Sequence, residues 1–115
     1  MNKNKNKGSA YERSIVDYLR SVGFTVDRTR AGWTDDRGDI HGVAGPGGPF
    51  TFECKNHRTL DLPAWYRELD VEIANNGGSV GAVIHKRHGV TDAAEQHVSL
   101  PLRVLVQLLR EAGYK

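Results

Sequence analysis

The sequence has little of what several classes of protein depend on. Its 115 residues include one cysteine, so an internal disulfide is excluded, and its Cys and His residues lack the spacing of a zinc site. No apolar run approaches the ~20 residues that span a membrane. The basic residues at the start have no apolar segment behind them, so we expect no signal peptide. We therefore expect a cytoplasmic protein of a reducing compartment, without a membrane partner.

A strong charge excess is also missing. There are 16 Lys and Arg residues against 14 Asp and Glu, which gives a net charge of +2 and a pI near 8.8. Proteins that coat DNA carry a larger positive excess. A nuclease is not excluded, because its catalytic site must itself hold several carboxylates. The composition is that of a globular protein, and the length predicts one domain with its own core.

Residues 1–7 alternate Asn and Lys, a low-complexity pattern that predicts a disordered basic arm before a single domain over residues 8–115. Two interpretations of this arm stay open. It is a solvated tail, or its lysines contact phosphates and add affinity without sequence specificity.

The rest of the chain alternates helical and strand patterns. Apolar residues at helical spacing predict helices over 9–22, 62–76 and 101–112. Strand patterns between turn residues cover 24–28, 38–43, 50–55, 79–84 and 96–100. This order predicts an α/β fold with a mixed β-sheet flanked by helices. Side chains expected in the core are Trp65 and Tyr66 with Leu102, Leu105, Leu108, Leu109 and Ala112. Arg67, Glu68, Asp70 and Glu72 are expected on the solvated face of their helix.

The Gly- and Pro-rich cluster 44–49 predicts a hairpin between two of these strands. Antiparallel pairing about residue 46 places Asp39 opposite Glu53, and side-chain alternation puts Lys55 on the same face. Two opposed carboxylates repel unless a cation lies between them. Because carboxylate and carbonyl oxygens suit Mg²⁺ or Mn²⁺, the hairpin predicts a divalent-cation site.

These residues resemble the signature of the PD-(D/E)xK nuclease superfamily, here Asp39 followed by Glu53-Cys54-Lys55. The segment Lys7-Gly8-Ser9-Ala10-Tyr11-Glu12-Arg13 is similar to the start of archaeal-type Holliday junction resolvases, in which a Glu on the first helix completes the metal site. One departure is that Gly38, not Pro, precedes the Asp.

The resemblance implies a restriction-endonuclease-like αβββαβ core and a metal-dependent DNA endonuclease. It favours a Holliday junction resolvase that cuts four-way junctions as a homodimer, with branched DNA and not a small molecule as substrate. Asp39, Glu53 and the Cys54 carbonyl would bind one or two Mg²⁺ ions, for which Mn²⁺ can substitute, and Glu12 would complete the site directly or through water. Lys55 would orient or deprotonate the attacking water, or act as a fixed charge. We expect it to stay charged beside two carboxylates, which favours the electrostatic role.

Candidates for gripping the DNA backbone are basic residues of the arm, of the loop before Asp39 and of the strand ends. They are Lys5, Lys7, Arg28, Arg30, Arg37, His57, Arg58, Lys86 and Arg87. In the same loop we expect Trp33 to pack under the chain, and Asp35 and Asp36 to be solvated, although an outer-sphere metal role stays open for one of them.

Other interpretations stay open. The chain could be another structure-specific or non-specific nuclease acting on flaps, ends or single strands, or a non-catalytic nucleic-acid-binding module. It could also be an α/β domain without a nucleic-acid role, in which Asp39, Glu53 and Lys55 form a surface salt-bridge cluster of little stabilising effect. Glu12 has a structural alternative as well, because Ser9 to Glu12 matches a capping box at a helix start.

Overall fold

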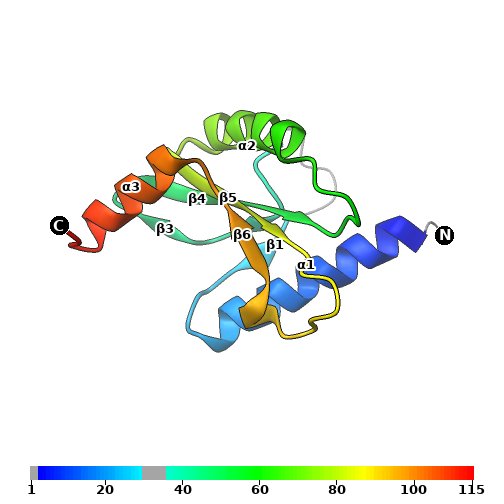
Figure 1. Ribbon diagram of the computed structural model, residues 1–115. Helices are drawn as coiled ribbons and strands as arrows, with labels where there is room; N and C mark the ends of the chain where they lie inside the picture. Colours follow the sequence, from blue (N-terminus) through cyan, green and yellow to red (C-terminus); the bar gives the residue numbers. More distant parts are fainter. Residues whose placement is uncertain (1–2, 30–35) are drawn as a thin grey trace.

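The computed structural model describes the backbone of residues 3–29 and 36–115, and side chains from Lys7 onward within these ranges. A six-stranded β-sheet is packed against three helices (Figure 1). The strand order is β1-β2-β4-β5-β6, with β3 paired to β4. The β4–β5 pair is parallel and the others are antiparallel. The predicted α/β class with a mixed sheet is therefore confirmed. Among the described residues, no helix is long and apolar enough to cross a membrane.

The elements follow the predicted order. They are α1 (Lys3–Ser21), β1 (Asp27–Arg28), β2 (Ile40–His41), β3 (Ala44–Gly45), β4 (Gly48–Lys55), α2 (Leu62–Asn76), β5 (Val80–His85), the 3₁₀ turn η1 (Ala93–Glu95), β6 (His97–Ser99) and α3 (Leu102–Glu111).

Helix α1 starts at Lys3, well before the predicted start at residue 9. Residues 3–7, expected to be a disordered arm, continue the helix instead. The division of the chain into an arm and a domain, and any contact of the arm with DNA, stay predictions. From Tyr11 onward the helix buries Ile15 and Val16 against Val26 and the sheet.

Helix α2 connects the parallel strands β4 and β5 and has the predicted bounds. Asp61 caps its start by accepting a hydrogen bond from the Ala64 amide, and Gly77 ends it in a left-handed conformation with φ of 82°. Trp65 and its neighbours on one helix face pack on Val83 of β5, as expected for a core aromatic. This crossover brings α2 over the end of β4 that carries Glu53.

The two long helices cover opposite faces of the sheet, α2 above it and α1 below it in Figure 1. Because side chains alternate along β4, Phe52 and Cys54 pack on the α1 side, whereas Glu53 is directed to the α2 side. The α2 side is thus the side on which the acidic residue of the hairpin meets a helix.

Helix α3 lies beside α2 and is linked to it by an ion pair between Arg103 and Asp70, whose atoms are 2.8 Å apart. Val104 is its buried side chain, while Leu102, Leu105 and Leu109 are exposed. The expectation that these three leucines and Ala112, which is exposed as well, face inward is therefore wrong. The helix docks on β5 through the neighbouring stripe of residues, so its Leu-rich stripe is turned outward.

Candidate metal and catalytic site

The hairpin contains a β-bulge that the sequence pattern did not predict. Next to the turn, the pairs are Ala44–Pro49 and Gly45–Gly48, whereas farther along Ile40 pairs with Phe52. The register therefore shifts by one residue between β3 and β2. Gly42 lies in the bulge with φ of 121°, and a side chain there would overlap the carbonyl oxygen of Thr25.

This bulge decides which residue faces Asp39. Continued without a bulge, the register of the turn would place Asp39 opposite Cys54, whose side chain points to the other face of the sheet. The one-residue shift restores the predicted opposition of Asp39 and Glu53. The Asp39 amide donates to the Phe52 carbonyl at 2.7 Å, and the Cys54 amide donates to Asp39 Oδ2 at 2.7 Å. These bonds fix the carboxylate beside β4.

Gly38, which precedes Asp39, has φ of 92°. A Cβ atom at this position would lie 2.6 Å from the carbonyl oxygen of Phe52. Proline fixes φ near −65°, so the proline of the superfamily signature could not adopt this conformation. The departure at Gly38 is therefore a requirement of the local backbone.

Lys55 lies between two acids. Its Nζ is 3.8 Å from Glu53 Oε1 and 2.6 Å from Glu68 Oε2. Burial opposes the lysine charge, but the hydrogen bond to Glu68 and the negative charges of Glu53 and Asp39 outweigh it and raise the pKa of Lys55. This agrees with the expectation that Lys55 stays charged.

Glu12 projects from the interior of α1, so the capping-box prediction is wrong: Ser9 is not the first residue of the helix. Its Oε1 accepts a hydrogen bond from Nε of Arg28 at 3.3 Å. Burial and the nearby Asp39 carboxylate raise the pKa of Glu12, and Arg28 opposes the shift. Glu12 is thus oriented toward the hairpin from the α1 side.

The predicted catalytic residues line one pocket of about 460 Å³ at the end of β4. Three of the predicted DNA-binding residues line it as well. The lining residues are Lys7, Gly8, Glu12, Asp39, Glu53, Cys54, Lys55, Asn56, His57 and Arg58.

Other predicted DNA-binding residues lie elsewhere. Lys86 donates to the Val90 carbonyl at 2.6 Å and lies 5.9 Å from the centre of the Tyr11 ring, so its charge is turned into its own loop. Arg37 and Arg87 are exposed and do not line this pocket. The side chain of Lys5 and the whole of Arg30 fall outside the described residues, as do Trp33 and Asp35.

The prediction missed one acidic residue of the site. Glu72 of α2, expected on the solvated face, is 1% exposed. Oxygen atoms of Asp36, Glu53 and Glu72 lie within 4.8 Å of one another, a grouping able to hold a metal ion. The signal was present in the sequence, because Glu72 follows the core residue Leu69 at helical spacing, just before the buried Ile73.

Three carboxyl groups, one half-buried and two buried, hold their protons unusually tightly. Burial and the neighbouring Glu53 raise the pKa of Asp39 to about 8, and burial and the neighbouring Glu72 raise the pKa of Glu53 to about 9. Burial also raises the pKa of Glu72 to about 7. Such a set requires protons or a cation at neutral pH. The all-oxygen donor set fits Mg²⁺ or Mn²⁺.

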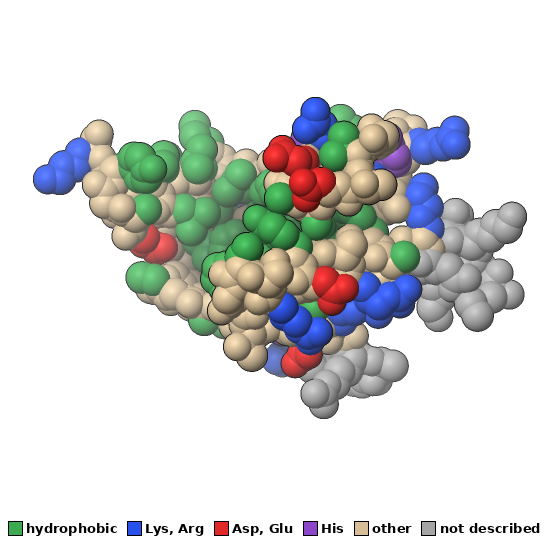
Figure 2. All heavy atoms as spheres, turned by 90° about the horizontal axis from the view of Figure 1, so that it is seen from below, with side chains coloured by type: hydrophobic (Ala, Val, Ile, Leu, Met, Phe, Trp, Pro, Cys, Tyr) green, Lys and Arg blue, Asp and Glu red, His purple; other side chains and the backbone are tan. Residues whose placement is uncertain are grey.

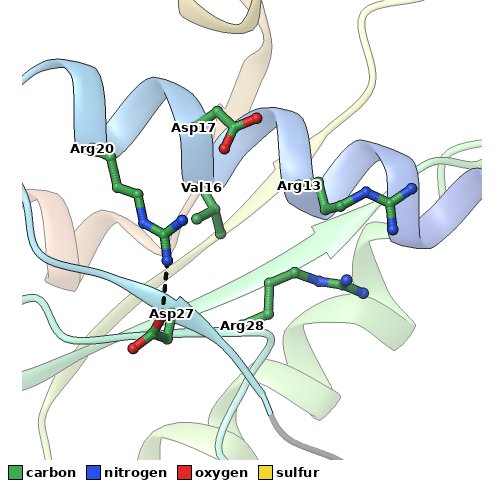
Figure 3. A pocket seen from close by; sticks show the side chains of 6 residues that line it. All are labelled: Arg13, Val16, Asp17, Arg20, Asp27 and Arg28. Atoms are coloured by element: carbon green, nitrogen blue, oxygen red, sulfur yellow. Dashed lines mark hydrogen bonds and ion pairs between the residues drawn. The ribbon is translucent and has the colours of Figure 1, made fainter.

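A second hollow, of about 350 Å³, lies between α1 and β1 (Figure 3). Arg20 closes one part of it through a 2.8 Å ion pair with Asp27. Arg13 of α1 and Arg28 of β1 point in the same direction in Figure 3, and Arg28 also contacts Glu12. This hollow thus continues the basic surface away from the acidic pocket.

A third hollow, of about 190 Å³, is lined mainly by apolar side chains, among them Tyr18, Phe50, Ile84 and Val98. It opens on the α1 side of the molecule. Figure 2 shows apolar side chains gathered in the middle of this side, while many Lys and Arg side chains lie toward the end where α1 begins. The charged and the apolar surfaces are therefore separate.

Comparison with known protein families and with curated proteins finds no match to this chain. The structure shows an α/β fold with a mixed sheet and an acidic cluster at the end of β4.

Proposed function

We propose that this protein is a divalent-cation-dependent DNA endonuclease of the PD-(D/E)xK type and that it resolves four-way junctions. One observation carries the proposal. The acidic and basic residues expected to act together, although distant in sequence, line a single pocket: Glu12, Asp39, Glu53 and Lys55. An incidental surface salt-bridge cluster does not explain a buried Glu53 that lies opposite Asp39 across a bulged hairpin, with the pKa of both carboxyl groups raised.

Asp39, Glu53 and the carbonyl of Cys54 would hold the first cation, which we call the hairpin site. A bound Mg²⁺ would supply Lewis acidity to the phosphate and lower the pKa of a coordinated water. The carboxylates of Asp39 and Glu53 would orient the reacting phosphate indirectly, by fixing where positive charge lies. Glu12 adds a further oxygen from the α1 side, directly or through water.

Lys55 would stabilise the charge that develops on the phosphate. Its raised pKa keeps the ammonium group protonated, so it acts as a fixed cation and not as a base. The hydrogen bond to Glu68 limits the positions that Nζ can take. Lysine and carboxylates therefore have separate tasks, the first in charge stabilisation and the second in cation binding.

The DNA backbone would cross the pocket along its basic rim. Lys7, His57 and Arg58 line the pocket beside the carboxylates. The hollow with Arg13 and Arg28 offers a continuation of this path along α1. Contacts of this kind bind phosphates and carry no base specificity, which suits recognition of DNA by shape.

Resolution of a four-way junction requires two cuts, and therefore two active sites related by a two-fold axis. We propose a homodimer for this reason. The apolar hollow with exposed Tyr18 and Val98 supports it, because a second copy would remove this surface from water. Because this apolar hollow is separate from the pocket with Lys7, His57 and Arg58, a dimer formed through it would leave that pocket open to DNA.

The test is a cleavage assay with labelled four-way junction, linear duplex, flap and single strand, each with Mg²⁺, Mn²⁺ or EDTA. Paired nicks confined to the junction and abolished by EDTA are expected. Analytical sedimentation of the protein with and without the junction measures its oligomeric state, which we expect to be a dimer. Cutting of flaps or linear DNA instead would support a nuclease whose substrate is not the four-way junction. Binding of DNA without any cleavage would favour a non-catalytic binding module.

A further inference from the structure

Glu72 is a buried acid of α2. Both of its carboxylate oxygens are inaccessible to solvent and lack a hydrogen-bond partner among the described residues. A buried polar group in this state costs free energy unless something else satisfies it. The other two members of the group that could hold a metal ion are themselves acids, Glu53 and Asp36. Glu72 therefore needs either a proton shared with these acids or a cation to satisfy its oxygens.

Three separate elements bring these acids together. Glu72 comes from α2, Glu53 from β4, and Asp36 from the segment before the hairpin. The position of Asp36 is fixed, because its backbone carbonyl accepts a 2.8 Å hydrogen bond from Asn75 Nδ2. Its Oδ1 also accepts a hydrogen bond from the Gly38 amide at 3.2 Å. The bond from Asn75, which lies about one helical turn after Glu72, thus holds Asp36 close to α2.

The spacing of the oxygens fits a coordination sphere. Ligand oxygens about 2.1 Å from Mg²⁺ are at most ~4.2 Å apart, and the wider shell of Ca²⁺ allows roughly 5 Å. The oxygens of Asp36, Glu53 and Glu72 lie within 4.8 Å of one another, which is close to the spread that the coordination sphere of a divalent ion allows. Three carboxylates also supply the negative charge that a divalent ion requires.

We propose that Glu72, Glu53 and Asp36 form a second divalent-cation site, which shares the Glu53 carboxylate with the hairpin site. The chemical role of this second ion rests on the proposed nuclease function. Two ions about 3.5–4 Å apart can stabilise both the attacking and the leaving oxygen of a phosphodiester. Binding of the ion does not rest on that function, because it is inferred from the grouping of three acids and from the unpartnered oxygens of Glu72 alone.

The test counts Mn²⁺ ions bound to the metal-free, full-length protein, by electron paramagnetic resonance of free Mn²⁺ during a titration. We expect two ions in the unchanged protein and one in Glu72→Gln. Asp36→Asn is the second variant, because Asp36 is exposed and its replacement should not affect folding; we expect its second ion to bind about 10- to 100-fold more weakly. Asp70→Asn on the exposed face of the same helix is the matched control and should bind two.

Equal Mn²⁺ counts and affinities in the unchanged protein, Glu72→Gln and Asp36→Asn would overturn the second site, even if the protein cuts DNA. Failure of the proposed nuclease can be distinguished from failure of the second site. Loss of the second ion in Glu72→Gln and its weaker binding in Asp36→Asn, in a protein that cuts none of the DNA substrates, would support the second site and overturn the proposed nuclease.

Discussion

Lys55 donates a 2.6 Å hydrogen bond to Glu68 of α2, while its Nζ lies 3.8 Å from the Glu53 carboxylate. The lysine is therefore held by an acid outside the hairpin site and stays within reach of that site. The two tasks proposed for the site, cation binding and charge stabilisation, therefore fall on different side chains and can be separated by mutation.

Replacement of Lys55 by alanine should remove catalysis and leave cation binding. We expect Lys55→Ala to cleave DNA about 100-fold more slowly or worse, because the fixed positive charge at the phosphate is gone. Its affinity for Mn²⁺ should stay within a few-fold, whereas Glu53→Gln should lose both properties. Single-turnover cleavage and Mn²⁺ titration measure the two effects. Full cleavage by Lys55→Ala would show that the site has been assigned wrongly.

The stability of the metal-free protein should fall as pH rises. Asp39 and Glu53 have folded-state pKa values of about 8 and about 9, above their ordinary values, so the folded state binds more protons than the unfolded state. This contribution is complete below the unfolded pKa of about 4 and is lost as pH rises through the folded values.

Thermal unfolding in EDTA between pH 5 and pH 9 measures this loss. Asp39→Asn is the control, because it removes one of the titrating groups, and its stability should depend less steeply on pH. Saturating Mg²⁺ should flatten the dependence in the unchanged protein, since the ion replaces the protons. A dependence in EDTA that is no steeper than that of Asp39→Asn would contradict the raised pKa of Asp39.

Gly38 should tolerate no side chain. Gly38→Ala places a Cβ 2.6 Å from the Phe52 carbonyl at a positive φ, so we expect a loss of roughly 1–3 kcal/mol in the free energy of unfolding. Mn²⁺ binding should weaken as well, because Asp39 follows directly. Gly45→Ala in the same hairpin is the control, since a Cβ there meets no atom within 4 Å. Equal stability of the two variants in urea denaturation would show that position 38 does not require glycine.

Local signals explain which parts of the fold could be predicted. The bounds of α2 followed from Pro63 near its start and Gly77 after its end, both of which act on the nearest backbone. The start of α1 did not follow, because the Asn and Lys residues before Gly8 have no apolar periodicity. A pattern of apolar residues detects a helix only where the helix is packed.

The site was predictable where it depends on strand pairing and not where it depends on tertiary packing. The opposition of Asp39 and Glu53 was predicted from the position of the turn, although the bulge at Gly42 that produces it was not. Glu72 was placed in solvent because of its charge, although its helical position is on the buried face. An acid on a buried face is a signal of function, because folding alone does not favour it.

Glu72 should lower the stability of the metal-free protein. Glu72→Leu keeps a similar volume and removes two buried oxygens that lack a donor among the described residues, so we expect the free energy of unfolding in EDTA to rise by about 1–3 kcal/mol at pH 8. At pH 5 the gain should be smaller, because the carboxyl group, with a pKa of about 7, is then protonated. Asp70→Leu on the exposed face of α2 should give no gain, since it only breaks a surface ion pair with Arg103. A loss of stability in Glu72→Leu without metal would mean that this carboxylate has a stabilising partner, and the reason to place a cation beside it would disappear.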